Sequence, residues 1–326
     1  MVLWVLVILS VMALEFSYAM RTEVRIAGNF KEETQLYAIA EGGVQRAIAE
    51  LIYKNDSRVQ QKRDKKIEEI PPEKREWITD GRVYPVPFDH GKCEVKVASE
   101  AGKVNINSVS EATLRRIVGQ LGLEGEARDV VVDSILDWRD PDDLYRINGA
   151  ENDYYRALKE PYDCKNANLD SIEELLLVRG VTPALFYGRK ETKKGEEGGN
   201  AEGIGLKDIF SIYASGEQVD INSASLPVLR VVVGIPGEVA QSILKAREEK
   251  GFKTPQELQQ RVPQLSSLMG EIGARMAYGS TATYYTIESR GKSKEGKAVR
   301  GMRVVVKIDR QEKAGYKVIQ WIDALL

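Results

Sequence analysis

The fold is decided by an uncharged apolar run, MVLWVLVILSVMAL, which occupies residues 1–14. Glu15 is the first acidic residue and Arg21 the first basic one, so apolar character continues through Met20 with a single charge. A helix rises about 1.5 Å per residue, and twenty residues therefore span roughly 30 Å, the thickness of a bilayer core. Because backbone amides in lipid must be bonded internally, residues 1–20 are expected to form a membrane-spanning helix.

This helix is interpreted as a retained anchor and not as a cleaved signal. A secretory signal has a basic segment before its apolar run and a small-residue cleavage motif after it, and this sequence shows neither. A buried core helix is the alternative interpretation. Such a helix seldom presents an apolar surface on all sides at the end of a chain, so the anchor is favoured.

Helical periodicity continues beyond the anchor. Apolar residues recur at helical spacing between Leu36 and Ile52, interleaved with charged residues, and no proline occurs before Ser57. The sequence therefore predicts one helix of roughly fifty residues. Its first part, residues 1–20, is apolar throughout, and residues 21–54 form an amphipathic continuation.

Strand patterns lie on both sides of a long helical region. Residues 55–107 begin with a polar loop and then alternate with period two, most clearly at Cys93–Ala98. Residues 108–280 are helical with short connections, and residues 281–326 return to strand patterns. The predicted fold class is α+β, with a long N-terminal helix on an antiparallel sheet and a large inserted all-α domain. The last strands are expected at residues 284–289, 302–308 and 316–322.

Composition excludes several kinds of chemistry. The 326 residues carry a formal net charge of −2, so no bulk positive field attracts nucleic acid. The single histidine leaves little material for zinc binding or for histidine-based acid–base catalysis. Cys93 and Cys164 have no CxxC spacing. They either form a disulfide in an oxidising compartment or remain two buried thiols.

The helical region contains an internal repeat. VNINSVS at residues 104–110 matches VDINSAS at residues 219–225, and a helix rich in Leu, Ile and Val follows each copy. Each helix leads to a short glycine hairpin, GLEG at residues 122–125 and GIPG at residues 234–237. The second copy resembles the helix-hairpin-helix modules of DNA-binding competence proteins over Val219–Leu258. Between the copies, residues 189–205 are rich in Gly, Lys and Glu and are expected to be a flexible surface loop.

Nucleic-acid binding by these hairpins is not expected. A helix-hairpin-helix grips phosphate with hairpin amides and with the positive end of its second helix. Glu124 and Glu238 lie at those helix starts, where a carboxylate stabilises the helix but repels phosphate. No Lys or Arg cluster is expected beside them, so both hairpins are predicted to be structural units.

An acidic loop is the most distinctive polar feature. Six carboxylates fall within the seventeen residues from Asp137 to Asp153, opposed only by two arginines. Such a cluster is either solvated or bound to a hard cation, and calcium takes about six to eight oxygen ligands. The spacing from Asp140 to Glu151 mimics an EF-hand only superficially, because Leu144 occupies a ligand position. A carboxylate-based hydrolase is a third interpretation, but no nucleophile accompanies the carboxylates.

These features together resemble the type II secretion system protein K family, the largest minor pseudopilins. The resemblance covers essentially the whole chain. It is most specific in GKVNIN at residues 102–107, ILDWRD at 135–140, GAENDYY at 149–155 and the second helix-hairpin-helix. It implies a pseudopilin fold with an inserted helical domain that contains helix-hairpin-helix-like repeats.

The resemblance also implies a function. Family members are non-enzymatic subunits that cap a short pseudopilus, joining the type II secretion proteins I and J through their N-terminal helices. They lie in the inner membrane as single-pass proteins with the soluble part in the periplasm, and they bind calcium in the helical domain. The residues expected to bind calcium are Asp140, Asp142, Asp143, Glu151 and Asp153. The alternative is a membrane-anchored DNA-binding protein of a competence or type IV pilus system.

The chain departs from the family pattern at its N-terminus. Family subunits carry a short basic leader that a prepilin peptidase removes, and the sequence shows no such leader before residue 1. Most pseudopilins also have a glutamate near the start of the mature helix. Residues 1–14 contain none, and protein K members likewise lack it. A subunit with no other subunit above it needs no such pairing group, which fits a position at the tip.

Overall fold

The structure, a computed structural model, describes residues 2–55, 77–188, 203–279, 283–294 and 299–325. It forms two compact units. The first contains Met1–Trp77, Arg82–Val97 and Thr286–Leu326, and the second contains Ile78–Gly81 and Ala98–Tyr285. The second unit is therefore longer at both ends than the insert expected at residues 108–280. Most of the loop expected after residue 55 and most of the 189–205 loop lie outside the described residues.

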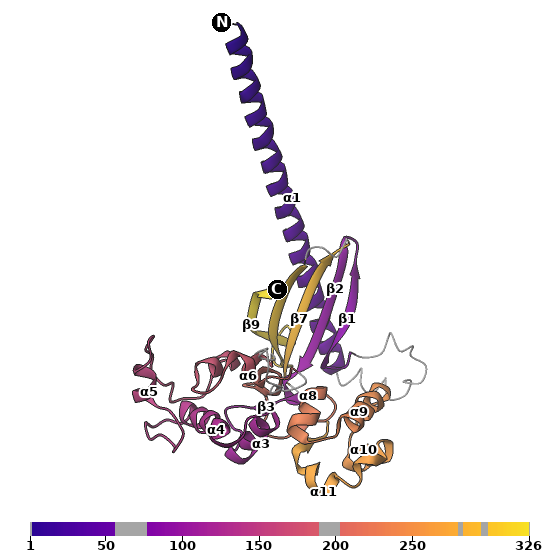
Figure 1. Cartoon of the computed structure of the whole chain (residues 1–326). Helices are drawn as coiled ribbons and strands as arrows, with labels where there is room; N and C mark the ends of the chain where they lie inside the picture. Colours follow the sequence, from indigo (N-terminus) through magenta and orange to yellow (C-terminus); the bar gives the residue numbers. More distant parts are fainter. Residues whose placement is uncertain (1, 56–76, 189–202, 280–282, 295–298, 326) are drawn as a thin grey trace. The chain divides into compact units, whose positions relative to one another are not determined.

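Helix α1 runs without a break from Val2 to Asn55, as predicted (Figure 1). Side chains from Val2 to Gln35 are exposed. Beyond them, the apolar residues at helical spacing turn toward the sheet and are buried. These residues are Leu36, Ile39, Ala40, Val44, Ala47, Ile48 and Leu51. The helix thus has an exposed N-terminal half and a C-terminal half that forms part of a core.

A five-stranded sheet covers this C-terminal half, in the order β1-β2-β7-β8-β9. The strands are β1 (Asp80–Phe88), β2 (Gly91–Ser99), β7 (Tyr284–Ser293), β8 (Val299–Ile308) and β9 (Tyr316–Leu325). β8 and β9 are antiparallel, with Val304 opposite Trp321 and Ile308 opposite Tyr316. β1 contains Pro85 and Pro87, which an edge strand tolerates because proline lacks the N–H that a second neighbour would require.

Helix and sheet approach each other closely at Gly43. A Cβ atom there would collide with the Cys93 Sγ on β2 and the Ser289 Oγ on β7. The Ser289 hydroxyl donates a 2.6 Å hydrogen bond to the Ala40 carbonyl oxygen, and the Cys93 Sγ lies 2.9 Å from the Ser289 Oγ. Cys93 and Cys164 are both buried free thiols, so of the two alternatives for the cysteines the structure has the thiols.

The second unit is mostly helical. Its longer helices are α3 (Glu111–Gln120), α4 (Gly125–Arg139), α9 (Gly237–Glu249) and α10 (Pro255–Arg261). Shorter helices are η3 (Glu100–Gly102), α5 (Asn152–Arg156), η4 (Ile172–Leu177), α6 (Pro183–Tyr187), α7 (Leu206–Ile209), α8 (Leu226–Val228), η5 (Leu229–Val233), η6 (Pro263–Leu265), α11 (Met269–Ile272) and η7 (Gly273–Arg275).

The expectation of an all-α insert needs one correction. Two short parallel pairs join its segments, β3 (Val104–Asn105) with β4 (Phe210–Ser211) and β5 (Val219–Asp220) with β6 (Met276–Ala277). They form because the start of each sequence repeat is extended, and its backbone groups pair with a distant extended segment. Such two-residue pairs give no alternating pattern that the sequence could have revealed.

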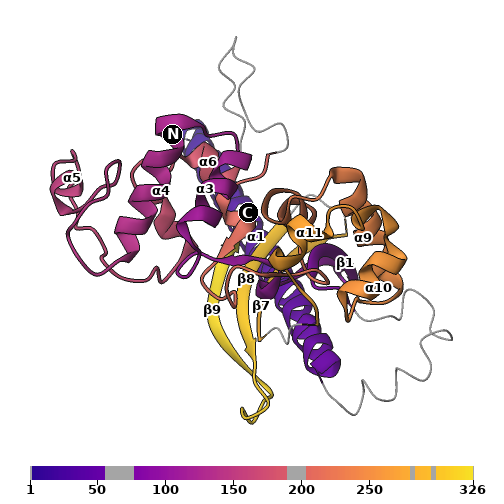
Figure 2. The same cartoon turned by 90° about the horizontal axis from the view of Figure 1, so that it is seen from below.

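The sequence repeat is also a structural repeat. Asn107 exchanges two hydrogen bonds with the backbone of Leu169, and Asn222 exchanges two with the backbone of Phe252. Arg139 donates to the carbonyls of Ile106 and Val109, just as Arg247 donates to those of Ile221 and Ala224. Figures 1 and 2 show the helices of the two copies as two groups within this unit, α3 and α4 in one and α9 and α10 in the other.

Replacing Gly43 with alanine should destabilise the first unit. The added methyl group must displace the sheet from the helix, and overpacking of this kind costs about 1–3 kcal/mol. The matched control is Gly28→Ala, because nothing lies within 4 Å of a Cβ atom at Gly28. Thermal unfolding of the full chain in detergent should show a lower midpoint for Gly43→Ala and no loss for Gly28→Ala; equal midpoints would contradict the close approach.

Candidate functional site

The acidic loop joins α4 to α5 in the second unit and is held to α4 by one arginine. Asp137, in the last turn of α4, is fully buried. It accepts hydrogen bonds from the backbone N–H of Arg146 and, at 2.7 Å, from the Arg146 Nη1. The same Nη1 lies 2.7 Å from the Asp140 Oδ2, so Arg146 bridges two of the carboxylates that the sequence places together.

Gly149 and Asn148 hold the end of the loop against α4. A Cβ atom at Gly149 would overlap the Asp137 Oδ2, so only glycine fits there. Asn148 donates from both its backbone and its side-chain amide to the Asp133 Oδ2, at 3.3 and 3.1 Å. These contacts fix the chain immediately before Glu151 and thereby position its side chain.

A second segment, residues 164–166, closes the site from the other side. The Asn166 side-chain amide donates to the Asp143 Oδ1 and to the Asp142 carbonyl oxygen, both at 2.9 Å. The Asn152 amide also donates to the Asp143 Oδ1, at 2.7 Å. Asn166 has a φ of 48°, in the left-handed region that asparagine tolerates better than most residues.

Four buried acceptor oxygens in this site receive no hydrogen bond from an N–H or hydroxyl group of the described residues. They are the Asp140 Oδ1, both Glu151 carboxylate oxygens and the Asn166 Oδ1. A buried acceptor without a donor costs about 1–3 kcal/mol, and more when it is charged. Acceptor oxygens of this kind are the ligands that calcium prefers. The donor set therefore fits a hard cation.

The charge of Glu151 is poorly tolerated where it lies. The pKa of Glu151 is raised to about 7, mainly by burial and in addition by the nearby carboxylates of Asp137, Asp140 and Asp143, while a hydrogen bond from the Cys164 thiol lowers it in part. Burial also raises the pKa of the Cys164 thiol to about 12. Glu151 thus requires either a proton or a cation near neutral pH.

The structure brings together some of the predicted metal ligands but not all. Asp140 and Glu151 have the unpartnered buried oxygens, and Asp143 lies beside them as the acceptor for two amides. Asp142 is exposed and accepts from the Leu144 backbone N–H, and Asp153 is exposed in the first turn of α5. Among the described residues, no three His, Cys, Asp or Glu side chains are grouped as a complete metal site.

The sequence reasoning missed Asn166 as a candidate ligand. It lies far from the loop in sequence, and it is an amide, so a search for carboxylate clusters passes over it. Asp137 belongs to the predicted acidic run and is paired with Arg146 of the same loop. Asn166 comes beside Asp143 because residues 164–166 fold back toward the loop, and nothing local in the sequence signals this.

The second hairpin also differs from expectation. No arginine cluster was expected there, yet Arg116, Arg230 and Arg275 surround residues 234–237. Arg116 comes from the first repeat and Arg275 from η7, so the sequence gives no local sign of the cluster. Two other arginines of these repeats are paired with carboxylates: Arg128 bonds with Asp129, and Arg247 is buried and paired with Asp80.

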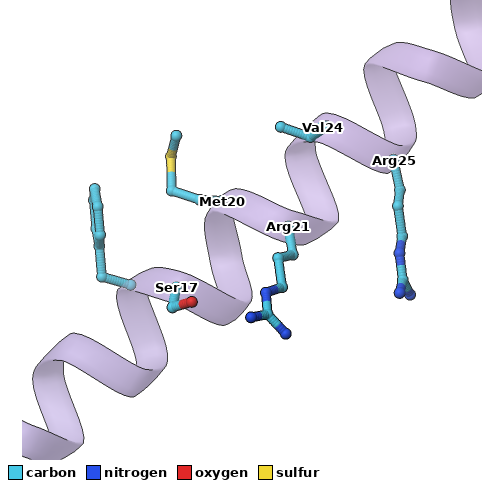
Figure 3. Close-up of a pocket in the computed structure, with 6 residues that line it drawn as sticks. Ser17, Met20, Arg21, Val24 and Arg25 are labelled. Carbon is cyan, nitrogen blue, oxygen red and sulfur yellow. The ribbon is translucent and has the colours of Figure 1, made fainter.

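The exposed half of α1 is the other candidate functional surface. Among the described helices, α1 is the one long and apolar enough to cross a membrane. Figure 3 shows its boundary region, where Met20 and Val24 project from one side and Arg21 and Arg25 from the other. The apolar stripe therefore extends past the first basic residues, as on a helix that leaves a membrane and meets another helix.

The fold defines the class: a pseudopilin-like protein with one long helix on an antiparallel sheet and a helical unit inserted between two adjacent strands. Residues 95–188 match the family model "Type II secretion system (T2SS), protein K", and residues 214–268 match a helix-hairpin-helix motif. The resemblance to the type II secretion system protein K family is therefore confirmed.

Curated relatives agree with this assignment. The chain is 24% identical to the type II secretion system protein K of Pseudomonas aeruginosa over 62% of its length and 57% of the relative. It is 26% identical to that of Aeromonas hydrophila over 60% of its length and 61% of the relative. The chain thus spans about three fifths of the length of these two relatives.

A solved structure supports the fold. One chain of the GspK–GspI–GspJ complex from the type 2 secretion system of enterotoxigenic Escherichia coli aligns with a TM-score of 0.61. The alignment covers 91% of this chain and 98% of that one, at 14% identity. At this identity the likeness shows the architecture, including the long helix, the sheet and the helical unit.

Replacing Glu151 with glutamine should change how stability depends on pH. In the metal-free protein, Glu151 takes up its proton at a higher pH when folded than when unfolded, so the free energy of unfolding should fall as pH rises from about 5 to about 8. Glu151→Gln removes this dependence, whereas Glu160→Gln, an exposed control, should keep it. Melting with chelator across this range measures the effect, and identical profiles for wild type and Glu151→Gln would contradict it.

Proposed function

We propose that the protein is a minor pseudopilin of type II secretion that lies at the tip of the pseudopilus. Residues 1–20 anchor it in the inner membrane, and the part of the chain beyond the anchor lies in the periplasm. The observation that carries the proposal is the exposed surface of α1, whose apolar side chains from Val2 to Phe30 meet no other described part of the chain. Such a surface requires lipid along its first part and protein along the rest.

Other pseudopilins are the partners that fit this surface. An amphipathic helix with an apolar stripe packs against similar helices in a bundle. The solved relative belongs to a complex of GspK with GspI and GspJ, which supports the type II secretion proteins I and J as partners of this chain. In this assembly the helical unit covers the end of the filament, and the role is structural and not catalytic.

Calcium is proposed to complete the acidic loop. Asp140, Glu151 and Asn166 would hold it through their unpartnered oxygens, with Asp143 nearby. The ion would supply positive charge to oxygens that no donor neutralises. By joining the α4–α5 loop to the segment at residues 164–166, it would fix the shape of the unit that covers the filament end.

Polar substitutions on the exposed half of α1 should weaken assembly. Val24, Ile26 and Phe30 are exposed apolar residues beyond the anchor, and full burial of one such side chain contributes about 1.5–3 kcal/mol. Val24→Asp, on the side of α1 that also presents Met20, should reduce co-purification with proteins I and J from membranes by about tenfold. Arg25→Ala, on the other side of the helix, is the control. Unchanged recovery of the complex would refute the helix-mediated contact.

Calcium should raise the melting temperature of the wild-type protein, and chelation should lower it. A ligand that binds only the folded state stabilises by about 2.7 kcal/mol at a concentration one hundred times its Kd. Asp140→Asn and Glu151→Gln should lose the response to calcium, because each removes a proposed ligand charge. Asp153→Asn should keep it, since Asp153 is exposed and lies outside the unpartnered set. A wild-type melting curve indifferent to calcium would exclude the site.

A further inference from the structure

Two arginines lie next to each other where the apolar part of α1 ends. Arg21 is the first basic residue of the chain, Arg25 follows it by four positions, and both are exposed. Residues four apart are neighbours on the surface of a helix. Figure 3 shows both side chains on one side of α1, with Met20 and Val24 on the other. The helix therefore carries a pair of positive charges at the border of its apolar span.

No carboxylate of α1 is placed to neutralise this pair. The other residues three or four positions from either arginine are all uncharged: Ser17, Tyr18, Thr22, Val24, Gly28 and Asn29. Glu23 lies between the two arginines in sequence, but residues two positions apart do not face each other on a helix. Among the described residues, neither guanidinium forms an ion pair or a side-chain hydrogen bond. Like charges four positions apart destabilise a helix, so the pair requires an anion from outside the chain.

Other helical arginines of this chain provide an internal comparison. Three of them pair with a carboxylate four positions away on the same helix: Arg46 with Glu50 on α1, Arg115 with Glu111 on α3, and Arg261 with Glu257 on α10. Such pairs stabilise a helix by a few tenths of a kcal/mol. The lack of a carboxylate at this spacing thus distinguishes the end of the apolar span from the later part of the same helix.

Phospholipid phosphate is the anion that lies at this level of the helix. Residues 1–20 span roughly 30 Å as a helix, which matches the hydrocarbon core of a bilayer. A membrane that holds these residues therefore places its phosphate groups beside Arg21 and Arg25. An arginine near the end of a spanning helix extends its charged group toward the interface. Guanidinium N–H donors also match the geometry of phosphate oxygens.

We infer that Arg21 and Arg25 together bind the phosphate group of an anionic phospholipid at the surface of the membrane that α1 crosses. The inference rests on the proposed anchor at residues 1–20. It gives the two sides of the helix different neighbours, lipid headgroups beside the arginines and partner helices beside Met20 and Val24 (Figure 3). A carboxylate on a partner helix is the other anion that these arginines could bind. It is disfavoured because the arginines point away from the apolar side.

Native mass spectrometry of the full chain in neutral detergent tests this inference, with phosphatidylglycerol and phosphatidylcholine as probes. The wild type should retain phosphatidylglycerol, which is anionic, in preference to phosphatidylcholine. A basic residue near an anionic surface contributes about fivefold in affinity, so Arg21→Gln/Arg25→Gln should reduce the preference by about tenfold or more. Lys31→Gln is the matched control and should keep the preference. Lys31 is exposed on the same helix but lies about 15 Å beyond Arg21, where salt screens its charge.

Several outcomes would overturn the lipid site. Equal retention of the two lipids by the wild type would remove it, and so would the same preference in the wild type and in Arg21→Gln/Arg25→Gln. Displacement of phosphatidylglycerol by millimolar inorganic phosphate would show a site for free phosphate. The double variant should still co-purify with proteins I and J. Loss of these proteins with an unchanged lipid preference would assign the arginines to a carboxylate of a partner.

Incorporation into phosphatidylcholine vesicles separates the lipid site from the anchor. The wild type and Arg21→Gln/Arg25→Gln should both be incorporated, because the apolar span does not depend on the arginines. Exclusion of both proteins would overturn the anchor and the lipid site together. Incorporation of the wild type without a preference for phosphatidylglycerol would overturn the lipid site alone.

Discussion

The structure depends on a single helix that must satisfy two different environments. Residues 1–20 of α1 are apolar on all sides, which suits lipid, while the part from Leu36 to Leu51 buries one stripe against the sheet. Because α1 is continuous, a force or rotation applied to one half reaches the other without an intervening hinge. At Gly43 the absence of a side chain leaves room for Cys93 and Ser289, and the Ser289 hydroxyl donates to the Ala40 carbonyl oxygen, so this half of the helix is bonded directly to the sheet.

The second unit contains the same arrangement of hydrogen bonds twice, with different side chains around each copy. Each copy has an asparagine that pairs with a distant backbone and an arginine that reaches two carbonyls, and these bonds stabilise the fold in the same way. Around that frame the surfaces differ. The first copy leads into a loop with buried carboxylate oxygens, and the second is bordered by Arg116, Arg230 and Arg275. The two copies of the repeat therefore carry different side chains around the same backbone arrangement.

Patterns that are local in sequence predicted the fold well. Periodicity from Leu36 to Ile52 located the buried stripe of α1, and the period-two alternation at Cys93–Ala98 located β2. The repeat of VNINSVS and VDINSAS located both helix-hairpin-helix frames. Each of these signals arises from neighbouring residues on one face of an element, so the sequence alone contains it.

Contacts between distant segments were not predictable in this way. The sequence revealed the acidic loop. It did not reveal that Arg146 pairs with Asp137 or that Asn166 lies beside Asp143. The arginine cluster was missed because its members lie on α3, η5 and η7, which only the folded chain brings together. The two parallel pairs were too short to leave a periodic pattern.

One consequence follows from the order of the strands. The chain leaves the sheet at the end of β2 and returns at the start of β7, and these two strands are neighbours. The insert therefore begins and ends on neighbouring strands. A tight turn could replace it without any change in the order of the strands. The insert is thus free to change in size during evolution while α1 and the five-stranded sheet keep the same architecture.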